Sequence, residues 1–231
     1  TYQKFIASNW LIKKFSFARI YPLTNQKINE RFDHKFLGIG NPSNLNSIDL
    51  PPLPTAEDEI RDIAVVSNAF SKEFILLGSQ ASKSNLVDRL NYSYERLVFA
   101  THAVPSNWRG LTSESSLILD DESGDYFLSS TDLVNLDIKS DVVVLSSCST
   151  EKAGSESLYK AFLVAGSNSV VYSNWELETT SASKITSELF KFMLFDDLSK
   201  HKALQSASIK ILNDYSSQSN IHPAIWGNFS I

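Results

Sequence analysis

The stretch VVVLSSC at residues 142–148 decides the fold, together with LVFATH at residues 97–102. Both begin with consecutive apolar residues rich in β-branched side chains, a pattern typical of strands buried on both faces of a parallel sheet. Similar apolar runs occur elsewhere, and amphipathic helical periodicity separates several of them. This alternation predicts an α/β fold with a mostly parallel sheet and helices on both faces.

The periodicity also places the individual elements. We expect strands at residues 15–20, 36–40, 74–77, 97–101, 142–146 and 170–172. We expect helices from residue 54 onward and at about 156–164, 179–195 and 204–212, with Thr55 and Asp58 as a capping-box pattern and Gly166 as a left-handed cap. Residues 41–54 read as a surface connection, and residues 120–125 as an acidic turn between short strands.

Length and composition favour one globular domain. The chain has 231 residues, of which 42% are apolar and 20% charged. Its net charge of −5 gives no basic field for a phosphate backbone, so no direct nucleic-acid partner is expected. No apolar run is long enough for a membrane helix and no secretory signal is visible, so we expect a cytoplasmic protein without membrane contact. Because the chain begins at Thr1, we expect it to be a fragment of a larger protein.

Two chemically active side chains follow the two decisive strands. His102 comes directly after the first strand, and Cys148, the single cysteine, comes after the second. Reactive groups gather at the carboxyl ends of strands in such sheets, so the two could meet. A thiol is mostly protonated near neutral pH, and a neighbouring imidazole can accept its proton. The alternative is that Cys148 is an inert buried side chain and His102 an ordinary loop residue.

The sequences around these two residues resemble those of a known family. ATHA at residues 100–103 is similar to an Ala-Thr-His-Gly segment, and VLSSC at residues 144–148 to a Leu-Ser-Ala-Cys-like segment, of the CHAT domains. These are caspase-like domains, often fused to tetratricopeptide repeats, in the group of caspases, separase and gingipains. Further similar segments, in the same order along the chain, are GIGNP at 38–42, LP at 53–54, AFLVAGS at 161–167, SNW at 173–175 and HPAIWGNF at 222–229.

The resemblance implies a caspase-like three-layer sandwich and a cysteine endopeptidase. In it His102 is the general base, Cys148 the nucleophile, and the backbone N–H groups of Ala103 and Cys148 stabilise the oxyanion. One position departs from the family, because Ala103 replaces the usual glycine. If that position requires a positive φ, the methyl group strains it. The alternatives are therefore a catalytically inactive scaffold that binds partners, or a small-molecule hydrolase or transferase that uses Cys148.

The resemblance also suggests a class of substrate and of partner. The resemblance suggests a protein substrate, a regulatory domain or partner such as tetratricopeptide repeats, and a role in a bacterial-type signalling or defence system. Relatives that prefer a basic residue before the scissile bond need a carboxylate in the pocket, and Glu176 and Glu178 are the candidates. The four histidines have no ligand-like spacing, so neither a metal nor a cofactor is expected.

Overall fold

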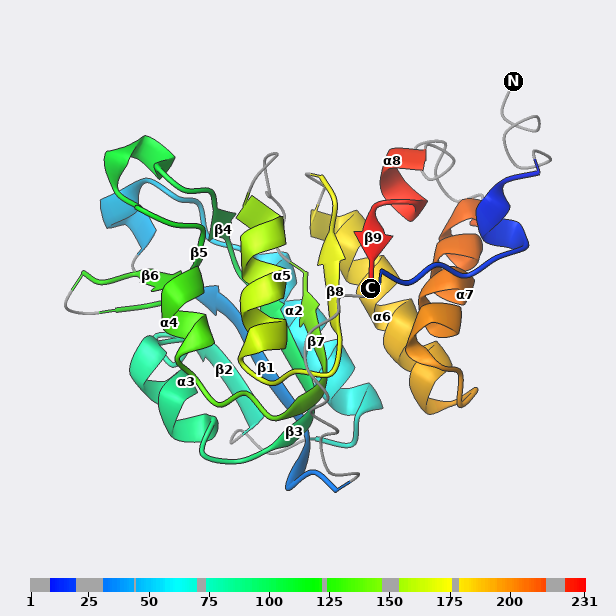
Figure 1. The fold of residues 1–231 in the computed structure, drawn as a ribbon, viewed down its shortest axis with the longest axis horizontal. Coiled ribbons are helices and arrows are strands. Elements are labelled where there is room, and N and C mark those ends of the chain that lie inside the picture. The colour runs from blue at the N-terminus through cyan, green and yellow to red at the C-terminus, as the bar shows by residue number, and fades with distance from the viewer. Residues whose placement is uncertain are drawn as a thin grey trace.

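A six-stranded sheet forms the centre of the molecule (Figure 1), in the order β2-β1-β3-β7-β8-β9. The computed structural model describes residues 9–19, 31–43, 45–69, 74–121, 124–146, 154–175, 179–214 and 223–231. The strands are β1 (His34–Pro42), β2 (Ile75–Gly78), β3 (Tyr94–Ala100), β7 (Ser140–Leu145), β8 (Val170–Ser173) and β9 (Phe229–Ser230). The first five are parallel, and β9 runs antiparallel to β8 at the edge.

Helices cover both faces of this sheet. One layer contains α2 (Pro54–Val66), α6 (Thr179–Leu194), α7 (Lys200–Asn213) and α8 (Pro223–Trp226). The opposite layer contains α3 (Lys83–Arg89), α4 (Ser130–Val134) and α5 (Gly154–Val164). In Figure 1, α4 and α5 lie in front of the sheet and α2 lies behind it. The fold is thus α/β, with three layers.

A small antiparallel sheet extends the layer that contains α4 and α5. It consists of β4 (Ala103–Val104), β5 (Ser116–Ile118) and β6 (Phe127–Ser129). Short 3-10 helices flank the structure: η1 (Leu11–Lys13), η2 (Leu45–Ile48) and η4 (Trp108–Gly110). The acidic stretch predicted as a turn joins β5 to β6, which pair antiparallel as a hairpin does.

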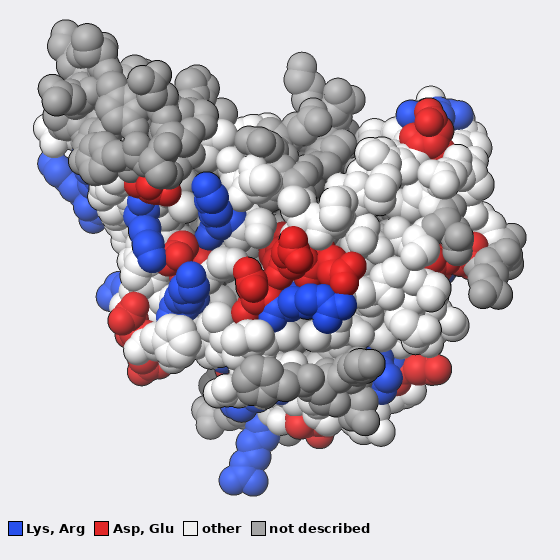
Figure 2. Space-filling model, turned by 180° about the vertical axis from the view of Figure 1, so that it is seen from behind, with Lys and Arg blue, Asp and Glu red and all other residues white. Residues whose placement is uncertain are grey.

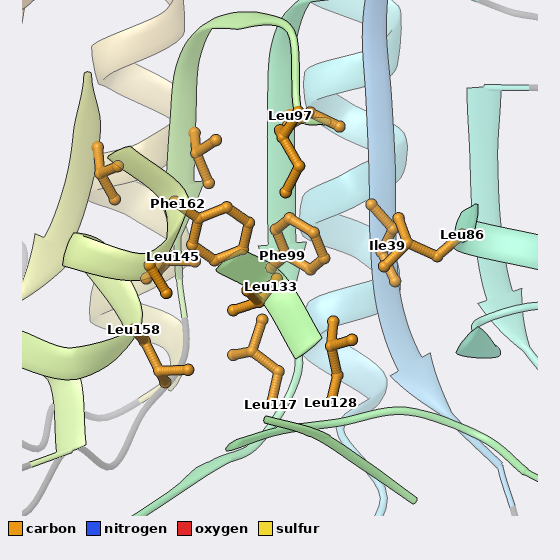
Figure 3. Close-up of a cluster of buried hydrophobic side chains, with 14 of the residues drawn as sticks. Ile39, Leu86, Leu97, Phe99, Leu117, Leu128, Leu133, Leu145, Leu158 and Phe162 are labelled. Atoms are coloured by element: carbon orange, nitrogen blue, oxygen red, sulfur yellow. The ribbon is translucent and has the colours of Figure 1, made fainter. Parts of the chain in front are cut away.

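Alternate residues of the central strands fill two separate cores. Leu97 and Phe99 of β3 face α5, where the ring of Phe99 lies 5.1 Å from that of Phe162, between ring centroids (Figure 3). Val98 and Ala100 of the same strand face the α2 and α6 layer. Successive side chains of a strand point to opposite faces, so a continuous apolar run is required where both faces are buried.

Two glycines allow close backbone approaches that shape these layers. A Cβ on Gly38 of β1 would lie 2.6 Å from Cγ2 of Ile60, so the glycine lets α2 pack directly onto the sheet. Gly166 follows α5 with a φ of +118°, and a Cβ there would lie 3.0 Å from the carbonyl oxygen of Ile138. The predicted positive-φ cap after this helix is therefore confirmed.

Most of the predicted elements are present, and two expectations are wrong. Residues 15–19 form no strand, because they join no ladder of the described sheets, although the N–H of Arg19 donates to the carbonyl of Ile231, just beyond β9, at 2.7 Å. The capping box is also absent. The N-cap of α2 is Leu53, Pro54 follows in the first turn, and no side chain caps the helix. Proline at that position has no N–H to satisfy and its fixed φ suits a helix start.

The face formed by α2, α6 and α7 carries mixed charge. Acidic and basic side chains lie next to one another on it (Figure 2). Arg61 pairs with Glu57 within α2, while Lys191 and Lys210 both pair with Glu188. The described part of this face therefore presents no continuous basic surface of the kind that holds a phosphate backbone.

Candidate active site

The two strands that precede the candidate residues are neighbours in the sheet. β3 and β7 are parallel, with Phe99 opposite Leu145, and the N–H of Ser146 donates to the carbonyl of Phe99 at 2.9 Å. The predicted adjacency of the strands is thus confirmed. His102 lies two residues beyond β3, whereas Cys148 lies outside the described residues. Contact between the two side chains therefore stays a prediction.

The backbone of His102 is held by β5. The buried hydroxyl of Thr101 donates to the carbonyl of Ile118, and the N–H of Ile118 donates to the carbonyl of His102 at 2.8 Å. These bonds connect the end of β3 to the small antiparallel sheet. The histidine is consequently placed by two elements that are distant in sequence, not by a free loop.

The imidazole of His102 is oriented by a backbone carbonyl. Its Nε2 lies 2.8 Å from the oxygen of Pro51. A carbonyl can only accept, so Nε2 carries the proton and Nδ1 is the basic nitrogen. Burial lowers the pKa of His102 below its ordinary 6.5, while the Pro51 carbonyl raises it in part. A neutral imidazole with an available lone pair at neutral pH is suited to general-base chemistry.

The connection that supplies this carbonyl is itself fixed. Asn41 adopts a φ of +42°, and its Oδ1 accepts the N–H of Leu53 at 2.8 Å. Nη1 of Arg109 donates to the carbonyl of Ile48 at 3.0 Å and lies 3.3 Å from the carboxylate of Asp49. The polar stretch predicted as a mere surface connection therefore forms part of the site.

Pro51 is a functional contact that the sequence analysis missed. The prolines at residues 51 and 52 indicate an irregular connection. A backbone carbonyl, however, has no sequence signature of its own, and its use as a partner for His102 depends on how the loop returns over the sheet.

The backbone of Ala103 does not adopt the positive φ that would strain an alanine. It lies in β4 in extended conformation and is not among the residues with positive φ. Since Ile118 bonds to His102, the next pair, Ala103 and Leu117, is a non-hydrogen-bonded pair of the ladder. The N–H of Ala103 is therefore directed away from β5, and its role as an oxyanion donor stays a prediction.

The carboxyl end of β8, next to β7, is held by hydrogen bonds to a residue that is far away in the sequence. Asn228 is completely buried, and its Oδ1 accepts the N–H groups of Asn174 and Trp175, each at 3.0 Å. Its Nδ2 donates to the carbonyl of Trp175 at 2.9 Å. Two of the segments that carried the family resemblance, at residues 173–175 and 222–229, thus meet in one hydrogen-bond network.

Glu176 and Glu178 lie outside the described residues, so their role as pocket acids stays a prediction. Within the described ranges, no group of three or more His, Cys, Asp or Glu side chains could hold a metal ion. In the same part of the chain, no helix is long and apolar enough to cross a membrane.

Comparison with known proteins identifies a family and similar folds. The family description "CHAT domain" matches residues 3–231, and no curated protein sequence matches the chain. The fold is similar to that of the Arg-specific cysteine proteinase gingipain R, with a TM-score of 0.54 at 8% identity, covering 86% of this chain and 46% of that one. A complex of the Porphyromonas gingivalis RgpB pro- and mature domains gives a TM-score of 0.51 at 10% identity, with 86% and 47% covered. The chain thus spans a little under half the length of these proteinases.

Proposed function

The chain belongs to the CHAT domain family, with a caspase-like fold, and on that premise we propose that it is a cysteine endopeptidase using His102 and Cys148. The observation that carries the proposal is the placement of His102. Its imidazole is held by Pro51 at the carboxyl end of β3, directly beside the strand that leads to Cys148. A thiol nucleophile needs a basic partner. The imidazole of His102 fits this role, because one nitrogen is hydrogen-bonded to a carbonyl and the other is left basic.

The proposed reaction follows from these positions. Nδ1 of His102 accepts the thiol proton of Cys148, and the thiolate attacks the scissile carbonyl carbon. The negative oxygen of the tetrahedral intermediate receives hydrogen bonds from the N–H groups of Ala103 and Cys148. The imidazolium returns its proton to the departing amine as the C–N bond breaks. Water activated by the same imidazole then hydrolyses the thioester and restores the free thiol.

The proposed substrate is a protein with a basic residue before the scissile bond. The structural neighbour gingipain R is described as Arg-specific, and this supports the same preference here. A carboxylate would pair with such a side chain in a bidentate manner, and Glu176 and Glu178 are the proposed partners. Their position directly after SNW at 173–175, at the carboxyl end of β8, supports this choice.

We further propose that the activity is controlled by a neighbouring domain or partner such as tetratricopeptide repeats, within a cytoplasmic signalling or defence system of bacterial type. An endopeptidase without control would damage its own cell. The segment at 104–117 begins in β4 and ends in β5, and the stretch between these strands, which includes the short η4, is long enough to carry such control. The test is turnover of peptides by this chain alone and by its parent protein with the activating partner. We expect low turnover alone, and high turnover by the isolated chain would contradict latency.

Thiol labelling separates the peptidase from an inactive scaffold. Cys148 is the single cysteine, so iodoacetamide labelling reports on this residue alone. We expect His102→Ala to slow labelling at pH 7 and to abolish peptide cleavage, which Cys148→Ala also abolishes, while folding stays nearly unchanged. His201→Ala, a histidine of α7, is the matched control and should change neither. Labelling that is independent of His102, with no cleavage by the activated protein, would favour the scaffold.

A further inference from the structure

A buried carboxyl group lies near the carboxyl end of β7. Glu59 of α2 is 1% exposed, and neither of its carboxyl oxygens has a hydrogen-bond partner among the described residues. Burying a polar group without a partner is costly, and an ionised one is more costly still. The packing of α2 requires only an apolar side chain at this position, so packing alone does not explain an acid.

Glu59 faces the end of the strand that leads to Cys148. The hydroxyls of Ser146 and Thr186 are near enough to influence its ionisation, although neither completes a hydrogen bond of ordinary geometry with it. Both are buried, and Oγ1 of Thr186 lies 3.5 Å from Oγ of Ser146 and 3.0 Å from the carbonyl of Ala182. α2, α6 and the end of β7 therefore meet in one internal polar cluster, defined as Glu59, Ser146 and Thr186.

The cluster lies close to the proposed nucleophile along the chain. Ser146 precedes Cys148 by two residues, so their Cα atoms are at most about 7 Å apart. The backbone N–H of Ser146 is bonded to Phe99, which fixes the serine relative to the sheet. A charge on Glu59 would therefore arise beside the strand end from which the chain continues directly to Cys148.

Other charges of the packed elements do not neutralise this carboxyl. Burial is the main cause that raises the pKa of Glu59, to about 7, and the hydroxyls of Ser146 and Thr186 lower it in part. The charged groups on the elements around it are exposed, paired with one another, or at the amino ends of the strands: Glu57, Asp58, Arg61 and Asp62 on α2, Lys184, Glu188 and Lys191 on α6, His34 and Lys35 on β1, Glu95 and Arg96 on β3, and Asp141 on β7.

We propose that Glu59 is a positioning residue that sets the reactivity of the Cys148 thiol through Ser146, favouring the thiolate when protonated and opposing it when ionised. The proposal rests on Cys148 being the nucleophile. A second negative charge nearby disfavours thiolate formation. For two unit charges about 10 Å apart at an effective dielectric constant of about 20, Coulomb's law gives an effect on the thiolate population on the order of tenfold. Because Glu59 exchanges its proton near neutral pH, the nucleophile becomes sensitive to pH in that range.

The experiment is the pH profile of Cys148 alkylation in the full chain. Iodoacetamide labelling, followed by mass spectrometry between pH 5.5 and 9, is compared for wild type, Glu59→Gln and the matched control Glu57→Gln on the exposed side of α2. We expect Glu59→Gln to equal wild type below pH 6 and to react up to about tenfold faster at pH 8. Glu57→Gln should follow wild type throughout.

Two further variants keep the result unambiguous. Glu59→Asp retains an ionisable group, so it should restore a wild-type pH dependence even if it lowers the melting temperature. His102→Ala tests the dyad itself, because it changes labelling whether or not Glu59 matters. A constant ratio of Glu59→Gln to wild-type rates across the pH range would overturn the Glu59 proposal. Labelling unaffected by His102→Ala would instead count against the proposed function.

Discussion

Replacing Glu59 by Gln should change how the stability of the fold depends on pH. Burial raises the pKa of Glu59 from 4.5 to about 7 in the folded chain. Between these two values the folded chain holds a proton that the unfolded chain has released. Stability contributed by this group is therefore fully present below pH 4.5 and is lost as pH rises through 7.

The magnitude follows from the same two values. Each pKa unit corresponds to about 1.36 kcal/mol, so the wild type should lose roughly 3 kcal/mol of unfolding free energy from this group between pH 4.5 and pH 8. Glutamine has nearly the same volume and does not titrate. The unfolding free energy of Glu59→Gln should therefore rise by roughly 3 kcal/mol relative to that of wild type over this interval. The other titrating groups are the same in both proteins, so they do not contribute to this difference.

Urea unfolding at pH 5, 6, 7 and 8 measures this difference directly. Equal m-values for the two proteins would allow midpoints to be compared as free energies. Glu57→Gln is the control, because it makes the same substitution on the same helix at a partly exposed side chain that pairs with Arg61. A wild-type to Glu59→Gln difference that is the same at pH 5 and pH 8 would refute the reasoning, since Glu59 would then not titrate differently in the folded chain.

Three other outcomes are expected. Asn228→Ala should lower the unfolding free energy by about 1–3 kcal/mol, because it removes both the Oδ1 acceptor of the Trp175 N–H and the Nδ2 donor to the Trp175 carbonyl, and unchanged urea midpoints would contradict this. The acid limb of kcat/KM for the activated protein should lie below pH 6.5, because burial lowers the pKa of His102; a limb at or above 6.5 would argue against His102 as the buried base. Changing Glu176 and Glu178 together to Gln should reduce cleavage after basic residues on a peptide library, and an unaltered preference would exclude them from the pocket.

The arrangement of the sheet could be largely anticipated from the chain itself. Consecutive apolar residues are needed wherever a parallel strand is covered on both faces, so residues 97–101 and 142–146 were recognisable as central strands. The family segments added the order of the elements. Residues 15–19 show the limit of this reasoning, because an extended segment becomes a strand only when another strand supplies its hydrogen bonds.

The finer construction of the site was decided by tertiary structure. His102 was recognisable by its place after a strand, but its orientation depends on the carbonyl of Pro51, which is 51 residues away and chemically like any other. Glu59 looks like a surface acid of an amphipathic helix, and only the packing of α6 and β7 around it removes water and makes its proton hard to release. Residue type and periodicity report local preference, whereas burial and hydrogen-bond partners arise from segments that meet only when the chain has folded.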